Sequence, residues 1–324
     1  MILFAIIFIS SFLITFLVKN IAKKKLMDVP NERSSHIQPT PRGGGLAIAL
    51  TWFGGLSYLF LNGQVAPNLY YSLMAGVLIS AISFIDDIYN LKSLPRLLIQ
   101  SLAALIALYF IGGLTRVDLG FYAIDNKILL TSIAFVGIIW FINLFNFIDG
   151  IDGYAASESV FISLVLFFFL KDSILIVLCM SVLGFLPWNW DKAKIFMGDV
   201  GSTLLGFTIC VLAVYYNNTE QFSILPNLML SSLFWFDATY TLYKRFQNKE
   251  RLGKAHRKHI YQRIVQSGFS HQKTVISAML INLLLFLLVW KTQESKQYVL
   301  LFLFINLILL FTITKIVNNK KPFK

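Results

Sequence analysis

The sequence is poor in charged residues and in cysteine. Asp, Glu, Lys and Arg together make up 14% of its 324 residues, whereas an average soluble domain carries about 25%. The two cysteines, Cys179 and Cys210, both fall inside apolar runs, so we expect neither a disulfide framework nor a cysteine-rich metal site. The sequence also lacks an internal repeat, a low-complexity tract and a polar stretch long enough for a soluble domain. We therefore expect one domain over residues 1–324.

Apolar residues take the place of the missing charge. They make up 57% of the chain and include 30 Phe, and the mean hydropathy is +0.70. A globular core cannot bury this much apolar surface, whereas a lipid bilayer can accommodate it, with Trp and Tyr at its interfaces. The composition therefore excludes an ordinary soluble protein and predicts an all-α polytopic membrane protein that contacts membrane lipids.

Long apolar runs predict the individual membrane spans. A transmembrane helix needs about 20 residues, with a range of about 17 to 25. About eleven runs have such a length, and the two that flank Lys171 and Asp172 predict a tight helical hairpin. The runs are 2–18, 44–62, 69–85, 95–111, 128–145, 155–170, 173–189, 201–216, 223–243, 274–290 and 297–317.

The distribution of Lys and Arg predicts the orientation of these spans. Run 2–18 has basic side chains after it rather than before it, unlike a secretory signal peptide, so we expect a retained helix with its N-terminus outside. In that orientation the inside segments carry 22 Lys and Arg and the outside loops carry five, as the positive-inside rule requires. The C-terminus is then cytoplasmic. The net charge of +12 belongs to the cytoplasmic face and predicts no nucleic-acid partner.

The first acidic motif, Asp86-Asp87, lies at the inner end of run 69–85. Charged residues are unfavourable at this depth unless they have a function or a partner. Neighbouring helical side chains point about 100° apart, so one acid can bind a metal while the other faces a second partner. The alternative is an interfacial helix end with solvated acids.

The second motif places Asn143, Asn146, Asp149 and Asp152 three residues apart. Residues at this spacing are neighbours on a helix, and segment 146–154 contains no Lys or Arg to pair with the acids. Carboxylate and amide oxygens suit a hard divalent cation. An Asx-rich helix cap is the alternative.

Two further motifs suit phosphate groups. Asp199 lies between glycines just before run 201–216, where a helix N-terminus favours anions; N-capping is the alternative. His256, Arg257 and His259 lie with Lys258 in the longest cytoplasmic loop, where arginine can form bidentate phosphate contacts. A surface patch for anionic lipid is the alternative reading of this second motif.

Weaker candidates lie in the first cytoplasmic loop and within one span. Arg33, His36 and Arg42 belong to a Pro- and Gly-rich loop and are candidate phosphate ligands. Asp237 lies inside run 223–243. An acid within the membrane is a functional candidate by default, and pairing with a polar group on a neighbouring helix is the alternative.

With these motifs together, the chain resembles the polyprenyl-phosphate N-acetylhexosamine-1-phosphate transferases of glycosyltransferase family 4. The resemblance covers about residues 28–265, which leaves the last two helices peripheral. It depends on Phe-Ile-Asp-Asp at 84–87, Asn-Phe-Ile-Asp-Gly-Ile-Asp-Gly at 146–153 and Phe-Met-Gly-Asp-Val-Gly-Ser at 196–202, in this order and at one membrane face.

The resemblance implies a reaction and its partners. A UDP-N-acetylhexosamine and undecaprenyl phosphate would give an undecaprenyl diphosphate-sugar and UMP at the cytoplasmic side of the inner membrane. Mg²⁺, or alternatively Mn²⁺, would be held by Asp87, Asp152 and Asp199. Asp86 would act as the base, and Asp86, Asp87 and Asp199 are the expected catalytic residues. The side chains expected to bind substrate are Asn143, Asn146, Asp149, Asp152, His256, Arg257, His259, Arg33, His36 and Arg42.

The histidine loop predicts the branch of the family. Its sequence, His-Arg-Lys-His-Ile-Tyr-Gln-Arg, lacks the three consecutive histidines of the peptidoglycan branch. It resembles instead the branch that starts O-antigen and related surface polysaccharides, whose donors include 6-deoxy N-acetylhexosamines. The sugar stays open between these and N-acetylglucosamine, and a homodimer also stays open.

Two rival functions remain. A polytopic transporter would fit the helix count, but transporter sites gather near the midplane of inverted repeats, whereas the acids here lie at one face. A phosphatidyltransferase that uses CDP-lipids would need Ala-Arg closely after an Asp-Gly, and Asp149-Gly150 and Asp152-Gly153 lack that arginine.

Overall fold

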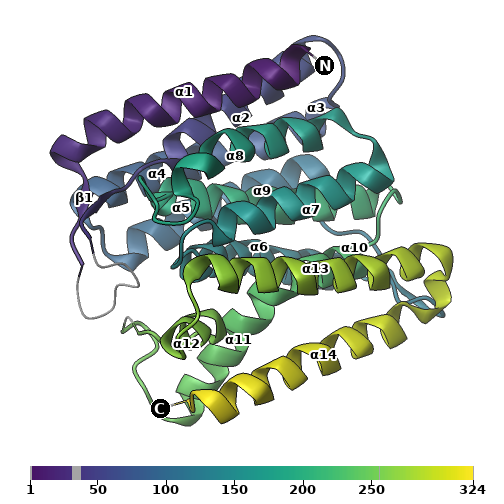
Figure 1. Cartoon of the computed structure of the whole chain (residues 1–324). Coiled ribbons are helices and arrows are strands. Elements are labelled where there is room, and N and C mark those ends of the chain that lie inside the picture. Colours follow the sequence, from purple (N-terminus) through teal and green to yellow (C-terminus); the bar gives the residue numbers. More distant parts are fainter. Residues whose placement is uncertain (1, 31–37, 255, 324) are drawn as a thin grey trace.

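The computed structural model describes residues 2–30, 38–254 and 256–323, and in this part the chain is a helical bundle with two short β-hairpins (Figure 1). Strands β1 (Met27–Asp28) and β2 (Thr40–Pro41) pair antiparallel, as do β3 (Val117–Asp118) and β4 (Ala123–Ile124). The helices are α1 (Ile2–Lys25), α2 (Gly45–Leu61), α3 (Pro67–Met74), α4 (Gly76–Tyr89), α5 (Ser93–Ile111), α6 (Lys127–Ile148), α7 (Tyr154–Leu170), α8 (Ser173–Asn189), α9 (Gly198–Asn218), α10 (Ile224–Leu230), α11 (Ser232–Gln247), α12 (Ile260–Gln266), α13 (His271–Glu294), the 3-10 turn η1 (Lys296–Tyr298) and α14 (Val299–Lys320).

Helices cover all eleven predicted ranges, but two of the ranges are broken. The third range is divided between α3 and α4 at Ala75, and the ninth between α10 and α11 at Ser231. Seven of the described helical segments are long and apolar enough to cross a membrane, and α2, α7 and α8 are shorter apolar helices. An all-α polytopic membrane protein is confirmed, while the count of eleven crossings and their orientation stay predictions.

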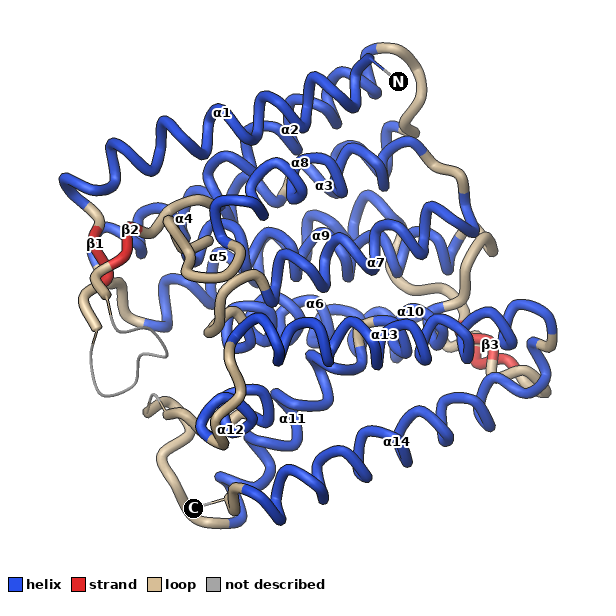
Figure 2. The backbone as a smooth tube through the Cα atoms, in the orientation of Figure 1, coloured by secondary structure: helices blue, strands red, loops and turns tan. Residues whose placement is uncertain are grey.

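Helix α9 lies in the middle of the bundle (Figure 2). It packs against α2, α4 and α6, and 83% of its most apolar window is buried, compared with 17% for α1 and 22% for the segment that contains α14. A helix that is apolar all round and buried on all sides belongs to a core. The outer helices α1, α13 and α14 instead expose apolar side chains, which suits contact with lipid.

Two glycines let α2 approach α9 closely. A Cβ on Gly45 would overlap the backbone nitrogen of Gly201, and a Cβ on Gly201 would lie 2.8 Å from the Cα of Gly45. The segment before α2 also pairs with the segment before α9. The N–H of Phe196 donates to the carbonyl of Pro41 at 2.8 Å, and the N–H of Gly45 donates to that of Met197 at 2.8 Å. The first loop is therefore held against the start of α9.

We expect Gly45→Ala to destabilise the protein, because its methyl group would meet backbone that cannot move aside. Overpacking of this kind costs about 1–3 kcal/mol. The measurement is thermal unfolding in detergent, where Gly45→Ala should lower the transition temperature. Gly54→Ala in the same helix is the control, since no described residue outside the adjoining backbone of α2 comes within 4 Å of the added methyl. Equal transition temperatures for the two variants would contradict the close α2–α9 contact.

Candidate active site

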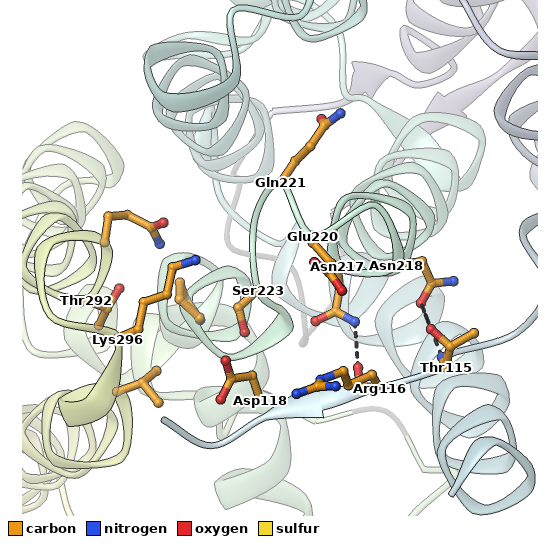
Figure 3. Close-up of a pocket in the computed structure, with 13 residues that line it drawn as sticks. Thr115, Arg116, Asp118, Asn217, Asn218, Glu220, Gln221, Ser223, Thr292 and Lys296 are labelled. Carbon is orange, nitrogen blue, oxygen red and sulfur yellow. Dashed lines mark hydrogen bonds between the residues drawn. The ribbon is translucent and has the colours of Figure 1, made fainter. Parts of the chain in front are cut away.

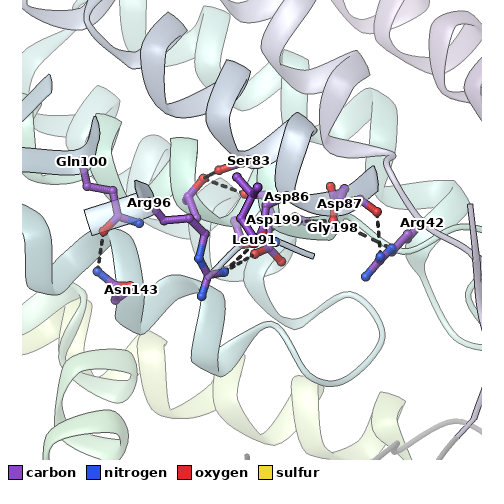
Figure 4. A network of polar contacts seen from close by, with 12 residues as sticks. Arg42, Ser83, Asp86, Asp87, Leu91, Arg96, Gln100, Asn143, Gly198 and Asp199 are labelled. Carbon is purple, nitrogen blue, oxygen red and sulfur yellow. Dashed lines mark hydrogen bonds and ion pairs between the residues drawn. The ribbon is translucent and has the colours of Figure 1, made fainter. Parts of the chain in front are cut away.

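Polar segments that are distant in the sequence meet at one end of the bundle, where α4 ends and α9 begins (Figure 4). Ser83 of α4 and Thr203 of α9 are hydrogen-bonded at 2.9 Å, about one turn from the acids on each helix. This contact holds the end of α4 beside the start of α9. The two acidic motifs on these helices therefore face one another.

Asp86 and Asp199 share one arginine. Nη1 of Arg96, near the start of α5, lies 2.5 Å from Oδ2 of Asp86 and 3.2 Å from Oδ2 of Asp199. Asn90 adopts the left-handed conformation at φ 50° and ends α4, so the chain turns back and the N–H of Leu91 donates to Oδ1 of Asp86 at 2.6 Å. Both oxygens of Asp86 thus have partners.

Asp87 has one carboxylate oxygen without a partner. The N–H of Asp199 donates to its Oδ1 at 3.4 Å, and Arg42 lies on the other side, with Nη2 donating to the Asp87 carbonyl at 2.7 Å. Oδ2 is buried and has no hydrogen-bond partner in the described part of the chain. A Cβ on Gly198, which has φ 74°, would lie 2.9 Å from this oxygen. A buried oxygen left without a partner is unfavourable, so a ligand is expected there.

The end of α6 contributes amide groups to the same place. Nδ2 of Asn143 donates to Oε1 of Gln100 on α5 at 2.9 Å and to the carbonyl of Ile139 at 2.8 Å. The side chain of Asn146 lies close enough to Asp199 to act on its carboxylate. Asn146 therefore belongs to the surroundings of the acids, whereas Asn143 holds α6 against α5.

Asp149, just after α6, lies within the electrostatic field of the neighbouring acids. Asp149 is half-buried. Burial raises the pKa of Asp149 well above its usual range, and the charges of Asp199, Asp152 and Asp87 raise it further. The negative charges of carboxylates from α4, the α6–α7 loop and α9 thus all act on the Asp149 carboxyl group. Such a field favours a cation, which would offset their repulsion.

Asp152, an expected metal ligand, has protein partners in this structure. Its Oδ2 lies 3.2 Å from Nδ1 of His271 and accepts the N–H of Ala193 at 3.2 Å. Among the described residues, no three His, Cys, Asp or Glu side chains are grouped closely enough to hold a metal ion. Mg²⁺ does not require such a group, because it commonly binds one or two carboxylates together with substrate phosphates and water. Asp87 and Asp199 fit that requirement, and a metal role for Asp152 stays a prediction.

The histidine loop is less positively charged than its sequence indicates. Burial, followed by the neighbouring charges of His259 and Arg245, lowers the pKa of His256 to about 4, so its ring is neutral near pH 7. His256 therefore adds no positive charge to this loop near pH 7, and its expected role in binding substrate stays a prediction. Arg257 and Lys258 line an open cavity of about 740 Å³ in this loop. Binding of a diphosphate there stays a prediction.

Asp237 holds this loop in place. Its oxygens accept hydrogen bonds from the N–H groups of Ile260 and Tyr261 at 2.8 and 3.1 Å, and Nδ1 of His259 lies 3.1 Å away. The carboxylate thus caps the first turn of α12, where free N–H groups favour an acid. Of the two sequence readings of Asp237, pairing with neighbouring polar groups is the one that the structure shows. His259 belongs to that pairing.

The first loop is only partly visible at the site. Arg33 and His36 lie outside the described residues, whereas Arg42 lies against Asp87. Sequence reasoning missed Arg96 and Gln100, which are neighbours on one face of α5, and His271. The signal is present in the sequence, since Arg96 follows Asp86 by ten residues across a turn.

A second polar cavity lies at the other end of the bundle (Figure 3). Its volume is about 480 Å³, and Thr115, Arg116, Asn218 and Lys296 are among its lining residues. Helix α9 has Asp199 in its first turn and ends at Asn218, 21 residues in all, which separates the two places by about 30 Å. The cavity therefore takes no part in the acidic cluster.

Comparison with known proteins agrees with this geometry. The family described as glycosyl transferase family 4 matches residues 69–217. A probable undecaprenyl-phosphate N-acetylglucosaminyl 1-phosphate transferase of Bacillus subtilis (strain 168) is 31% identical over 99% of this chain and 94% of its own length. The chain belongs to the polyprenyl-phosphate N-acetylhexosamine-1-phosphate transferase family.

Other members of the family show similar agreement. A decaprenyl-phosphate N-acetylglucosaminephosphotransferase of Mycobacterium leprae (strain TN) is 31% identical, over 76% of this chain and 72% of its own. An undecaprenyl-phosphate alpha-N-acetylglucosaminyl 1-phosphate transferase of Escherichia coli (strain K12) is 27% identical over 83% of this chain and 77% of its own length. The chain is thus a multi-pass membrane enzyme of the glycosyl-1-phosphate transferase class, and the transporter and CDP-lipid readings are set aside.

We expect Arg96→Ala to lower transferase activity about ten- to a hundredfold. Hydrogen bonds to charged groups contribute about 1.5–3 kcal/mol, and each 1.36 kcal/mol corresponds to about tenfold in rate. Arg96→Lys should retain part of the activity, because it keeps the positive charge between Asp86 and Asp199. Arg116→Ala is the control, since the Arg116 side chain forms an ion pair with the exposed Asp125 at the other end of the bundle. Full activity of Arg96→Ala would refute a role for the shared ion pair.

Proposed function

We propose that this enzyme transfers N-acetylglucosamine 1-phosphate from UDP-N-acetylglucosamine to undecaprenyl phosphate, releases UMP and starts a lipid-linked cell-surface glycan of the O-antigen or a cell-wall type. The observation that carries the proposal is the meeting of Asp87, Asp149 and Asp199 from three separate segments at one end of a membrane bundle. Phosphoryl transfer depends on positioning and on stabilising charge, which such a cluster with its two arginines supplies.

Asp87 and Asp199 are the residues that would hold Mg²⁺, with Mn²⁺ as the alternative. Oδ2 of Asp87 is buried without a partner, and the N–H of Asp199 already holds the other oxygen of Asp87. When bound, the metal would neutralise negative charge on the diphosphate of the donor. Arg96 keeps the Asp199 carboxylate in place, and Arg42 does so for Asp87.

The reaction requires little covalent help from the protein. An oxygen of the lipid phosphate attacks the phosphorus that carries the sugar. The new P–O bond forms a diphosphate as the bond to the UMP oxygen breaks. A phosphate monoester is largely ionised at neutral pH, so it is already a nucleophile and needs no covalent Asp intermediate. Both oxygens of Asp86 have partners, which favours a positioning role for Asp86 through Arg96 over the base role that the resemblance implies.

The donor sugar and the membrane side follow from two further arguments. The relatives named above all carry N-acetylglucosamine in their names, which supports that donor over a 6-deoxy sugar. The basic excess of the segments that flank the acidic cluster supports the cytoplasmic side of the inner membrane. The polyprenyl phosphate would then approach from the inner leaflet.

The decisive experiment is a turnover assay with purified protein in detergent, undecaprenyl phosphate and labelled UDP-sugars. UDP-N-acetylglucosamine should give a lipid-linked product and one UMP per sugar, and Asp199→Asn should lower the rate at least about a hundredfold by removing a charge from the cluster. Asp125→Asn, an exposed acid away from the site, is the control. If only a UDP-6-deoxy-N-acetylhexosamine gives product, that sugar nucleotide is the donor in place of UDP-N-acetylglucosamine. If no UDP-sugar gives product, the proposal is overturned.

We expect EDTA to abolish turnover and Mg²⁺ to restore it. Because a ligand that binds only the folded state stabilises that state, millimolar Mg²⁺ with UMP should also raise the thermal transition temperature of the wild type. Asp87→Asn should lose that rise. A wild-type enzyme that keeps full turnover in EDTA would show that the carboxylates act without a metal.

A further inference from the structure

Helix α13 lies after residues 69–217, which the family model matches. Its first residue, His271, nevertheless contacts the acidic loop between α6 and α7, which carries Asp149 and Asp152. His271 is preceded by Ser270, whose Oγ accepts the N–H of Lys273 at 3.2 Å and caps the helix. The cap determines where α13 begins and points the His271 ring at the loop between α6 and α7. The side chains of His271 and Asp152 are 14% and 10% exposed, so both are largely shielded from water.

One ring nitrogen of His271 contacts both the main chain and the side chain of Asp152. With the ring proton on Nδ1, this nitrogen can donate to Oδ2 of Asp152, 3.2 Å away. Without that proton, Nδ1 instead accepts the backbone N–H of Asp152 at 3.4 Å. The ring therefore holds the carboxylate in the tautomer that carries its proton on Nδ1. The N–H of Ala193 donates to the same Oδ2 at 3.2 Å. Both of these contacts are to Oδ2, which leaves Oδ1 of Asp152 able to accept a hydrogen bond from a ligand.

The other side of the loop is held through its backbone. The N–H of Gly153 donates to Oδ1 of Asn189 at 3.0 Å, and Nδ2 of Asn189 donates to the carbonyl of Ile195 at 3.1 Å. A Cβ on Gly153 would lie 2.8 Å from the ring of Trp190. These contacts fix the path of the chain but not the rotation of the Asp152 carboxylate, which His271 and Ala193 contact through Oδ2.

A separate contact positions α13. Nδ2 of Asn282 donates to Oε2 of Glu158 on α7 at 2.6 Å, and both side chains are fully buried. This pair lies eleven residues along α13 from His271, about 16 Å away by helical rise. The helix therefore keeps a polar contact with α7 when His271 is replaced, which allows an effect on the acidic loop to be separated from loss of the helix.

We propose that His271 is a positioning residue, which fixes the rotation of the Asp152 carboxylate so that Oδ1 faces the sugar nucleotide. The inference rests on the proposed function for the nature of that ligand. Helix α13 then contributes a positioning residue to the candidate active site. Because His271 acts through Asp152, its removal should matter only while Asp152 keeps its carboxylate.

The test is a double-mutant cycle on purified protein with UDP-N-acetylglucosamine as the varied substrate. His271→Ala should lower kcat/KM about tenfold or more, and His271→Asn, whose amide can replace Nδ1, should recover much of the loss. In the background of Asp152→Asn, the His271→Ala substitution should have no further effect, since interacting residues are not additive. Gln272→Ala, an exposed neighbour, is the control and should match the wild type.

The outcomes separate this inference from the proposed function. Wild-type turnover alone decides whether the enzyme uses this donor. Given turnover, additive losses from His271→Ala and Asp152→Asn, or an unchanged kcat/KM for His271→Ala, would overturn the positioning role. A transition temperature within about 2 °C of the wild type identifies the variants whose fold is preserved and for which the kinetic comparison holds. Should His271→Ala fall outside that range, the cycle with His271→Gln decides by the same criterion.

Discussion

Repulsion between carboxylates that lie close together in a partly buried place is the main constraint on the candidate site. Carboxylates repel one another strongly where water is scarce, and each also loses hydration. Arg96 between Asp86 and Asp199 offsets part of this repulsion, and Arg42 beside Asp87 offsets another part. The remaining charge acts on Asp149. A site built in this way would be stabilised by a further bound cation, in agreement with the metal proposed above.

The bundle supplies the rigidity that this arrangement needs. Helix α9 is buried on nearly all sides and carries Asp199 in its first turn. The close approach of Gly45 and Gly201 and the pairing of the segments before α2 and α9 hold the first loop beside Asp199. Acids mounted on packed helix ends cannot move apart to relieve their repulsion. The packing of helices that are distant in the sequence thus keeps these carboxylates close together despite their mutual repulsion.

Two acids near the same face illustrate how partners distinguish a structural role from a functional one. Asp237 accepts hydrogen bonds from Thr241 and from two N–H groups of α12, and it lies beside His259. Asp87 keeps one buried oxygen without a partner. Both residues satisfied the same sequence criterion, an acid in or beside an apolar span. The difference follows from which groups face them, because a satisfied carboxylate stabilises the loop it caps, whereas an unsatisfied one favours a ligand.

The sequence by itself determined the all-helical membrane fold, the positions of the helical segments and the acids at their ends. Long apolar runs can form few structures other than membrane helices, since backbone polar groups must be satisfied within lipid. Only the tertiary structure decided the breaks at Ala75 and Ser231, the sharing of Arg96 and the burial that lowers the pKa of His256. It also decided the contact between Asp152 and His271, which are 119 residues apart. Such pairs depend on which faces of distant helices meet, and that is decided by packing in three dimensions rather than by any pattern along the chain.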